Sequence, residues 1–271
     1  PPTRVTAFHR FGLGTYELDG QQCVDSVATA LDAGYRHLDT AQGYDNETEV
    51  TAGIDQSSVD REDVFVATKL STDQPSYDDA VETARVSADR LGVETIDLLY
   101  VHWPIDSYDA PETCRALDDL RAEGTIRHVG VSNFRPDQLD TARDHLSSPI
   151  FAHQVECHPL LPQPELRRYA REHDHWLVAY SPIARNRVAD VPAVRAVADD
   201  HDATPAQVAL AWLLSKDHVA AIPKATGERH LRENLAAADL TLSAAALERL
   251  DGIDRRDRIV DFDRAPWNAA D

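Results

Sequence analysis

The feature that most constrains the fold of this chain is an alternation, repeated eight times, of a short apolar segment with a longer amphipathic one. Several of the short segments contain continuous apolar runs and do not alternate between apolar and polar residues, which is typical of parallel strands buried on both faces. The alternation predicts an α/β protein with a (β/α)8 TIM barrel, and a doubly wound sheet is the alternative. The expected strands span residues 12–15, 36–39, 64–69, 96–102, 127–132, 151–156, 176–181 and 219–223.

The amphipathic segments predict helices whose ends carry recognisable signals. Gly34, Gly92 and Gly124 each follow an expected helix, where glycine can adopt the left-handed conformation that ends it. Thr204 followed by Pro205 is typical of an N-cap and the first helical position. The expected helices span residues 22–32, 47–56, 77–91, 112–123, 136–145, 164–173, 205–214 and 228–238.

Length and composition favour one domain. A chain of 271 residues with 42% hydrophobic residues suits a single barrel over residues 1–271, with a short N-terminal segment at 1–11 and a short tail at about 251–271. The sequence has no apolar run long enough to span a membrane. Its first residues lack the basic region and apolar core of a secretory signal. We therefore expect a cytoplasmic protein.

The charge of the chain restricts its partners. The net charge is −20, and lysine occurs three times. Such a charge repels nucleic acid and acidic membranes, so we expect neither as a partner. Acidic, lysine-poor surfaces are typical of salt-adapted proteins, which makes halophily a hypothesis. Cys23, Cys114 and Cys157 are odd in number and widely spaced, which favours three packed thiols over disulfides or a redox pair.

Four polar side chains lie at or just after the ends of expected strands, namely Asp39, Tyr44, Lys69 and His102. Each alone has a structural explanation, such as a helix cap, a loop anchor or a core histidine. In a barrel, however, catalytic groups gather where the strands end. Burying a polar group without a partner costs roughly 1 to 3 kcal/mol, so four of them in apolar surroundings indicate a shared site.

One group of residues superficially resembles a metal site. His153, Glu156, Cys157 and His158 lie close together in the sequence. Strand alternation, however, sends His153 and Glu156 to opposite faces, and the residues after Glu156 enter a turn. We therefore expect no metal.

Nine short motifs of this chain resemble those of the aldo-keto reductases, barrel enzymes that reduce carbonyl groups with a nicotinamide cofactor. The resemblance extends over essentially the whole chain. The matching stretches are GLGT at 12–15, YRHLDTA at 35–41, YDNE at 44–47, ATK at 67–69, VHWP at 101–104, GVSNF at 130–134, QVECHP at 154–159, AYSP at 179–182 and IPK at 222–224.

The resemblance implies roles for the four strand-end residues. Tyr44 is the expected general acid, which gives its proton to the carbonyl oxygen as hydride arrives. Lys69 favours the phenolate by its charge, and Asp39 pairs with Lys69. His102 orients the substrate carbonyl and shares in proton transfer.

The resemblance also implies a site for NADPH or NADH. Tyr180 stacks on the nicotinamide, and Ser132, Asn133 and Gln154 hydrogen-bond its carboxamide. The last two loops of the barrel hold the rest of the cofactor. The expected segments are 181–185 for the pyrophosphate, with Ser181, Pro182 and Ile183 as contacts, and 224–234 for the adenosine end. The contacts expected at the adenosine end are Lys224, Ala225, Thr226, His230, Glu233 and Asn234.

The second of these loops departs from the NADP-binding pattern of the family. Those members commonly carry serine or threonine directly after the lysine and an arginine six residues after it, where this chain has Ala225 and His230. Arginine can grip a 2′-phosphate through two donors, whereas neutral histidine offers one donor and less charge. We therefore expect use of both cofactors, with a reduced preference for NADPH. A solvent-facing His230 without influence on selectivity is the alternative.

The substrate pocket is expected to contain Tyr16 and Trp103, while Trp267 either adds a third aromatic side chain or packs in the core. Aromatic walls suit apolar or sugar-like carbonyl compounds, and small aldehydes, α-dicarbonyls and keto-sugars all remain open. The short segment after Leu250 predicts a pocket more open than in family members with long C-terminal loops, and we expect a monomer. Two other functions stay open, a Schiff-base aldolase and a non-catalytic NADP-binding regulatory subunit.

Overall fold

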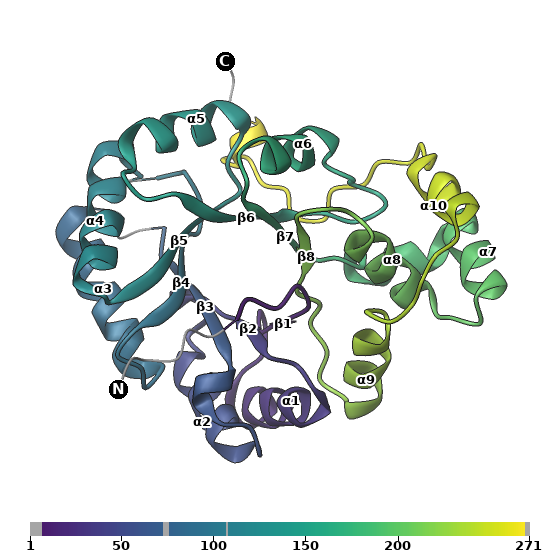
Figure 1. Cartoon of the computed structure of the whole chain (residues 1–271), viewed down its shortest axis with the longest axis horizontal. Helices are drawn as coiled ribbons and strands as arrows, with labels where there is room; N and C mark the ends of the chain where they lie inside the picture. The colour runs from purple at the N-terminus through teal and green to yellow at the C-terminus, as the bar shows by residue number, and fades with distance from the viewer. Residues whose placement is uncertain (1–6, 73–75, 107, 269–271) are drawn as a thin grey trace.

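The computed structural model describes residues 7–72, 76–106 and 108–268. In this part of the chain, eight parallel strands form one sheet in the order of the sequence, and each strand pairs with the next. The helices surround the sheet (Figure 1). The strands are β1 (Leu13–Gly14), β2 (His37–Asp39), β3 (Phe65–Leu70), β4 (Ile96–Val101), β5 (Ile126–Ser132), β6 (Ile150–Glu156), β7 (Trp176–Tyr180) and β8 (Val219–Ala221).

The first and last strands close the sheet into a barrel. Phe11 forms a parallel bridge with Ala221, and the Gly12 amide donates a 2.9 Å hydrogen bond to the Ala221 carbonyl. The Ala221 amide in turn donates to the Arg10 carbonyl at 2.8 Å. The Arg10 guanidinium adds bonds to the carbonyls of Leu214, Lys216 and Val219. Closure confirms the predicted barrel and excludes the doubly wound alternative.

All eight predicted helices are present outside the sheet. Helix α8 begins as its sequence predicts, because Thr204 and Gln207 exchange hydrogen bonds in a capping box. Gly34 ends the first helix with a φ of 119°. The helices are α1 (Gly20–Ala33), α2 (Glu47–Gln56), α3 (Tyr77–Arg90), α4 (Ala110–Glu123), α5 (Pro136–His145), α6 (Pro164–Glu172), α8 (Pro205–Leu214) and α9 (Glu228–Ala236).

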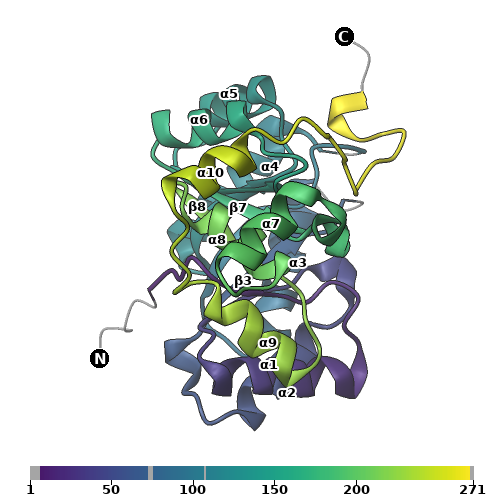
Figure 2. The same ribbon diagram turned by 90° about the vertical axis from the view of Figure 1, so that its right-hand side faces the viewer.

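Two helices and several short turns were not predicted. Helix α7 (Pro192–Asp200) lies between β7 and α8, and α10 (Ala244–Asp251) follows α9; both lie near α8 on the same side of the barrel (Figure 2). Four segments form 3₁₀ turns, and the first of them carries Tyr44. These turns are η1 (Gln42–Tyr44), η2 (Arg61–Asp63), η3 (Ala184–Asp190) and η4 (Pro266–Asn268).

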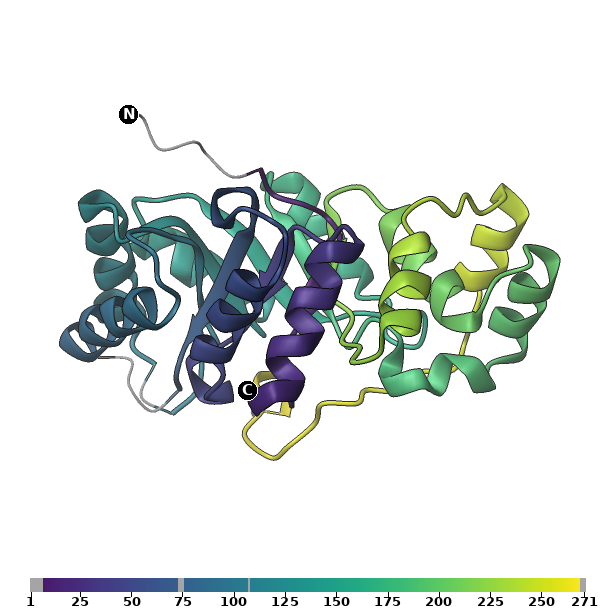
Figure 3. The same ribbon diagram turned by 90° about the horizontal axis from the view of Figure 1, so that it is seen from below.

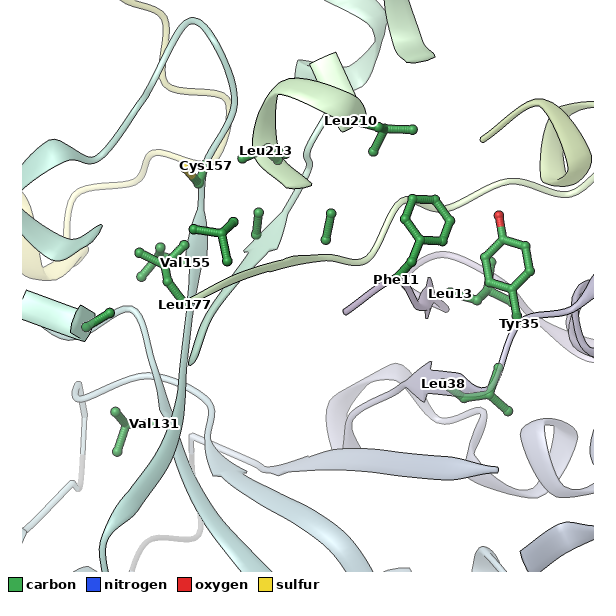
Figure 4. Packing of buried hydrophobic residues seen from close by; sticks show 14 of the residues in the cluster. Phe11, Leu13, Tyr35, Leu38, Val131, Val155, Cys157, Leu177, Leu210 and Leu213 are labelled. Atoms are coloured by element: carbon green, nitrogen blue, oxygen red, sulfur yellow. The ribbon is translucent and has the colours of Figure 1, made fainter. Parts of the chain in front are cut away.

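Buried apolar side chains form two layers. One layer packs between the strands and the helices, where Leu13, Leu38, Val131 and Leu177 lie (Figure 4). The other fills the inside of the barrel and includes Phe65, Leu98, Tyr100, Ala152, Val178 and Ala220. The three cysteines are free and buried, as expected. None of the helices in the described ranges is long and apolar enough to cross a membrane.

The N-terminal end of the barrel is closed by an aromatic plug. The Phe8 ring lies 5.2 Å from Phe65, 5.3 Å from Phe151 and 5.2 Å from Trp176, measured between ring centroids. It also lies 5.1 Å from the ring of His37. Access to the barrel is therefore from the opposite end, where the strands terminate.

The C-terminal tail crosses that open end. After α10 the chain runs back along the face opposite the N-terminal segment (Figure 3). Ile259, Val260, Asp261 and Phe262 become part of a cavity wall there. The tail is short, yet it is long enough to reach across the barrel and form part of this wall.

Candidate active site

A cavity of about 690 Å³ opens at the carboxyl ends of the strands. Asp39, Tyr44 and His102 line it, while Lys69 is fully buried behind them. The four strand-end residues singled out by the sequence therefore meet at one site. The cavity also contains the predicted residues Tyr16, Trp103, Ser132, Asn133, Gln154, Tyr180, Ser181, Pro182, Ile183 and Lys224.

Asp39 and Lys69 form a buried ion pair at the base of the cavity. Strand β2 ends on Asp39, which pairs in register with Ala67 of β3, so Lys69 is two residues further on and on the same face. The Lys69 ammonium lies 2.5 Å from one Asp39 oxygen and donates to the Thr40 carbonyl at 2.7 Å. The Gln154 amide donates to the other Asp39 oxygen at 2.7 Å. Both charges are thus fully coordinated.

This pairing keeps Lys69 charged. Burial alone would lower the pKa of the ammonium, but the Asp39 carboxylate and the Tyr44 phenol act against it, and the net pKa is raised. A lysine nucleophile must be neutral and reach its substrate. Lys69 meets neither condition.

Tyr44 lies directly above the ion pair. The η1 turn after β2 places its ring with the Lys69 ammonium 4.9 Å from the ring centroid and the His102 ring 5.7 Å away. Burial raises the pKa of the Tyr44 phenol, while Lys69 opposes the rise. The phenol is therefore protonated near neutral pH and lies beside a cation that favours loss of the proton.

Asn46 fixes the turn that carries Tyr44. Its side-chain amide donates to the carbonyls of Thr15 at 2.9 Å and Leu18 at 2.8 Å, and its oxygen accepts from the Thr40 hydroxyl at 2.6 Å. Asn46 is 1% exposed, so water does not compete for these bonds. We infer that this residue, which sequence analysis did not assign to the site, determines the position of the Tyr44 ring.

His102 follows β4 and lies between Tyr44 and Trp103. Burial, together with the charge of Lys69, lowers the pKa of His102 to about 3. The imidazole is therefore neutral at physiological pH and has one N–H donor. Trp103 packs against Phe262 and Trp267 of the tail, at centroid distances of 5.0 and 5.7 Å, so Trp267 lies at the rim and not in the core.

A hydrogen-bonded network of Ser132, Asn133, Gln154 and Tyr180 forms another part of the wall. The Tyr180 hydroxyl donates to the Asn133 side-chain oxygen at 2.9 Å, and the Asn133 amide donates to the Ser132 hydroxyl at 3.0 Å. Ser132 donates to the Gln154 carbonyl at 2.9 Å. Burial raises the pKa of Tyr180 well above its usual value, so it remains a donor. These hydrogen bonds hold the four side chains in fixed orientations.

The loop after β7 has an unusual backbone. Ser181, Ala184, Arg185 and Asn186 all have positive φ angles, between 45° and 70°. Residues other than glycine adopt this conformation at a cost, and such strain concentrates at functional sites. The loop presents Ser181, Pro182, Ile183 and Arg185 to the cavity.

Of the contacts predicted in the loop after β8 and in α9, Lys224 is the one that lines the described cavity. Ala225 packs against the core, while Thr226 and His230 are exposed, Glu233 is half-buried and Asn234 is buried on α9. These five residues do not line the described cavity. The cations here are already engaged. The pairs are Lys224 with Glu17 at 3.2 Å, Arg229 with Glu233 at 3.2 Å and Arg232 with Glu228 at 2.9 Å.

Several cavity residues were missed by sequence analysis. Glu17 contributes charge at the rim, and the tail contributes a wall of its own. Glu17 lies two residues after a matched motif, so position could have suggested it. Arg185 also lines the cavity and belongs to the segment expected at the pyrophosphate. The tail carries no motif. The remaining unpredicted lining residues are Gly14, Thr15, Ile222, Ile259, Val260, Asp261 and Phe262.

The suspected metal ligands do not gather around a common point. Within the described ranges no group of three or more histidine, cysteine, aspartate or glutamate side chains could hold a metal ion. Glu156 instead accepts a hydrogen bond from His158 at 2.9 Å and binds backbone amides of the tail.

A barrel with this cavity is the framework of many enzymes, and comparison with known proteins identifies the family. The model of the aldo/keto reductase family matches residues 9–255. The chain belongs to this family.

Individual relatives agree with this assignment. A 2,5-diketo-D-gluconic acid reductase B from a Corynebacterium species is 37% identical over 90% of this chain and 88% of the relative. A glyoxal reductase from Bacillus subtilis is 35% identical over 92% and 90%. The crystal structure of an aldo-keto reductase from a Medee basin deep-sea metagenome library has a TM-score of 0.86 and 31% identity, and the match covers 94% of this chain and 97% of that one.

The chain is therefore an oxidoreductase that reduces carbonyl groups with NADH or NADPH. The family match covers all eight strands and the cavity residues as far as Lys224, whereas the cavity residues Ile259, Val260, Asp261 and Phe262 lie beyond it.

Proposed function

We propose that Tyr44 is the general acid of this reductase. The observation that carries the proposal is the stacking of three groups: the Asp39 carboxylate, the Lys69 ammonium 2.5 Å from it, and the Tyr44 ring above that ammonium. When Tyr44 gives its proton to a carbonyl oxygen, the phenolate that forms is stabilised by the adjacent cation. Solvent entering the cavity then restores the proton.

His102 orients the carbonyl. Its depressed pKa, about 3, keeps the ring neutral, so one ring nitrogen can donate a hydrogen bond while the other accepts. A donor from His102 and the Tyr44 hydroxyl together fix the carbonyl oxygen between the two rings, which lie 5.7 Å apart. Asp39 acts through Lys69, whose charge and position it maintains.

The side chains of the cavity suit a nicotinamide dinucleotide. The amides of Asn133 and Gln154 and the Ser132 hydroxyl match a carboxamide, the Tyr180 ring offers a flat face, and Lys224 and Arg185 supply cations for phosphates. When bound, the reduced cofactor supplies the hydride that the carbonyl carbon accepts. Ser181, Pro182 and Ile183 contact the pyrophosphate in this proposal, and Ala225, Thr226, His230, Glu233 and Asn234 surround the adenosine end.

We further propose that the enzyme uses both cofactors, with a weak preference for NADPH. The three cations from Lys224 to Arg232 are all held by carboxylates, and the His230 ring accepts a hydrogen bond from the Arg229 guanidinium at 2.9 Å. A 2′-phosphate must compete with Glu17, Glu233 and Glu228 for these charges, whereas a 2′-hydroxyl need not.

The two alternative functions have less support. A Schiff-base aldolase needs a neutral, accessible lysine, and Lys69 is fully buried and paired with Asp39. A non-catalytic regulatory subunit has no need of four converging side chains with their charges arranged for proton transfer. The converging residues are Asp39, Tyr44, Lys69 and His102.

Turnover by the wild type and Tyr44→Phe tests the proposed function. Oxidation of NADPH and NADH is followed with a panel of small aldehydes, α-dicarbonyls and keto-sugars. We expect Tyr44→Phe to lower kcat/KM by about 10² to 10⁴. Tyr16→Phe is the matched control, because Tyr16 lies on the same wall, 5.2 Å from the Tyr44 ring, and is 49% exposed. Equal turnover by wild type and Tyr44→Phe would contradict the mechanism.

Three coarser properties complete the proposal. A cytoplasmic location is supported by three free, buried thiols, which suit a reducing compartment. A monomer is supported by the positions of the large apolar side chains exposed in the described ranges, because Tyr16 and Phe262 line the cavity and Val86 lies apart from them on α3. Light scattering of the purified protein would test whether it is a monomer. The substrate in this proposal is a small carbonyl compound.

A further inference from the structure

We propose that Glu156 is a positioning residue for the carbonyl substrate, because it anchors the tail segment that forms one wall of the cavity. Glu156 ends β6 and is 1% exposed. The inference rests on the reductase function proposed above and extends it to the residue that shapes the substrate side.

The Glu156 carboxylate binds three N–H groups. One oxygen accepts from the His158 ring at 2.9 Å and from the Ile259 amide at 2.6 Å, and the other accepts from the Val260 amide at 2.7 Å. Two successive amides of the tail thus end on one buried carboxylate, more than a hundred residues earlier in the chain. Charged acceptors in such surroundings form strong hydrogen bonds.

The other ties of the tail are one backbone hydrogen bond and several contacts of partly exposed groups. The Asp257 amide donates to the Leu160 carbonyl at 3.0 Å, two residues before the anchored pair. Asp257 also pairs with Arg187 at 2.9 Å, Arg135 donates to the Pro266 carbonyl at 2.7 Å, and Arg264 pairs with Asp106. Exposed ion pairs contribute little because solvent screens them. Glu156 is therefore the buried charged contact that holds Ile259 and Val260 at the cavity wall.

The anchored segment reaches the substrate side through its side chains. Ile259, Val260 and Phe262 present an apolar surface, and the Phe262 ring meets the Trp103 ring edge to face at 5.0 Å. Trp103 directly follows His102, the proposed carbonyl-binding residue, and its ring contacts both His102 and Phe262. The tail is therefore connected to His102 through the Trp103 side chain. A carbonyl compound with an apolar substituent gains most from this wall.

Glu156→Gln tests the anchor. Glutamine offers one acceptor oxygen and turns an NH₂ group toward an amide that also donates, so at least one tail amide loses its acceptor. Hydrogen exchange in the peptide containing Ile259 and Val260 should become about tenfold faster. The KM for 4-nitrobenzaldehyde should rise about tenfold, with kcat and the Kd for NADPH within about twofold of wild type.

Asp118→Asn is the matched control. Asp118 also accepts from two successive backbone amides, those of Ser147 at 2.7 Å and Ser148 at 2.9 Å, but it lies on α4 at the other end of the barrel. This variant should leave the KM for 4-nitrobenzaldehyde unchanged. If both variants shift KM equally, the effect of Glu156 is general destabilisation and the proposal is wrong.

Phe262→Ala provides a second arm if Glu156→Gln folds poorly. Phe262 is 36% exposed, so its removal leaves the fold intact while it shortens the wall. It should reproduce the rise in KM for 4-nitrobenzaldehyde, and the KM for glyceraldehyde should change less than about twofold. An unchanged KM for the aromatic aldehyde overturns the proposal. Absence of turnover in the wild type would instead contradict the reductase function, and the exchange measurement would still report on the anchor.

Discussion

Glu17 and Lys224 form an ion pair at the rim of the cavity, with 3.2 Å between the Lys224 ammonium and a Glu17 carboxylate oxygen. It joins the loop after β1 to the loop after β8, two segments that both line the cavity. Glu17 has therefore a direct influence on the cation that is proposed to meet the adenosine end of the cofactor.

Glu17→Gln should raise the preference for NADPH. The substitution frees the Lys224 ammonium and removes a negative charge that would face a 2′-phosphate. Because both side chains are partly exposed, we expect the ratio of kcat/KM for NADPH to that for NADH to rise roughly two- to fivefold. Glu112→Gln, which breaks an exposed pair with Arg115 on α4, should leave the ratio unchanged.

His230→Arg should raise the same ratio by about tenfold. His230 is exposed on the first turn of α9, where an arginine would have room to bind a phosphate through two donors. The measurement is kcat/KM for both cofactors in the wild type and the variant. An unaltered ratio would show that His230 does not determine the choice.

Asp39→Asn should destabilise the protein by about 3 to 5 kcal/mol, because it leaves the buried Lys69 ammonium without a counter-charge. The double variant with Lys69→Met removes both charges and should be more stable than Asp39→Asn alone. Neither should retain more than about one hundredth of the activity. Urea unfolding gives the stabilities, and a double variant no more stable than the single one would count against the ion pair.

Acid should destabilise the protein through His37. Burial lowers the pKa of His37 to about 4, against 6.5 in the unfolded chain. Its Nδ1 must donate to the His9 carbonyl at 3.0 Å, and in the described part of the chain Nε2 has no partner, so a second proton finds no acceptor. The unfolded chain binds that proton first, so stability is complete above pH 6.5 and is lost as the pH falls toward 4.

The contribution of His37 to this acid sensitivity is about 3 kcal/mol. His37→Asn keeps a donor toward the His9 carbonyl but does not titrate. The difference in unfolding free energy between pH 7 and pH 4 should therefore shrink by about this amount. His145→Phe, at an exposed position, serves as the control and should retain the full wild-type difference.

Salt should stabilise the protein if its acidic surface is an adaptation. A net charge of −20 produces self-repulsion that extends over about 10 Å at 0.1 M salt and about 3 Å at 1 M. We expect the Tm to rise as KCl increases from 0.1 M to 2 M. A Tm that stays level or falls over this range would rule out halophily as the origin of the composition.

The regular part of the fold was predictable because local signals, such as helix caps and apolar runs, agreed with the eightfold alternation of strands and helices. Most strand positions are buried and many are apolar, as in β7 and β8, and α2, α5 and α8 have the predicted bounds. Helices α7 and α10 were missed. Helix α7 is the first of two helices between β7 and β8, where the eightfold alternation predicts one.

The site was predictable where it depends on strand ends and unpredictable where it depends on distant chain segments. Asp39, Tyr44 and His102 follow strands whose ends must meet, so their convergence was expected. The contact between Glu156 and the amides of Ile259 and Val260 joins parts of the chain that no periodicity relates. Backbone amides carry no sequence signal, which is why the contribution of the tail to the cavity wall was not predicted.

The closure of the barrel between Arg10, Phe11 and Ala221 has a consequence for how the chain folds during synthesis. The first strand can find one neighbour early, but its other edge stays unpaired until β8 has left the ribosome. During that time an edge of unsatisfied N–H and C=O groups is available to other chains. Mutual repulsion between the acidic surfaces then keeps nascent chains apart while that edge remains unpaired with β8.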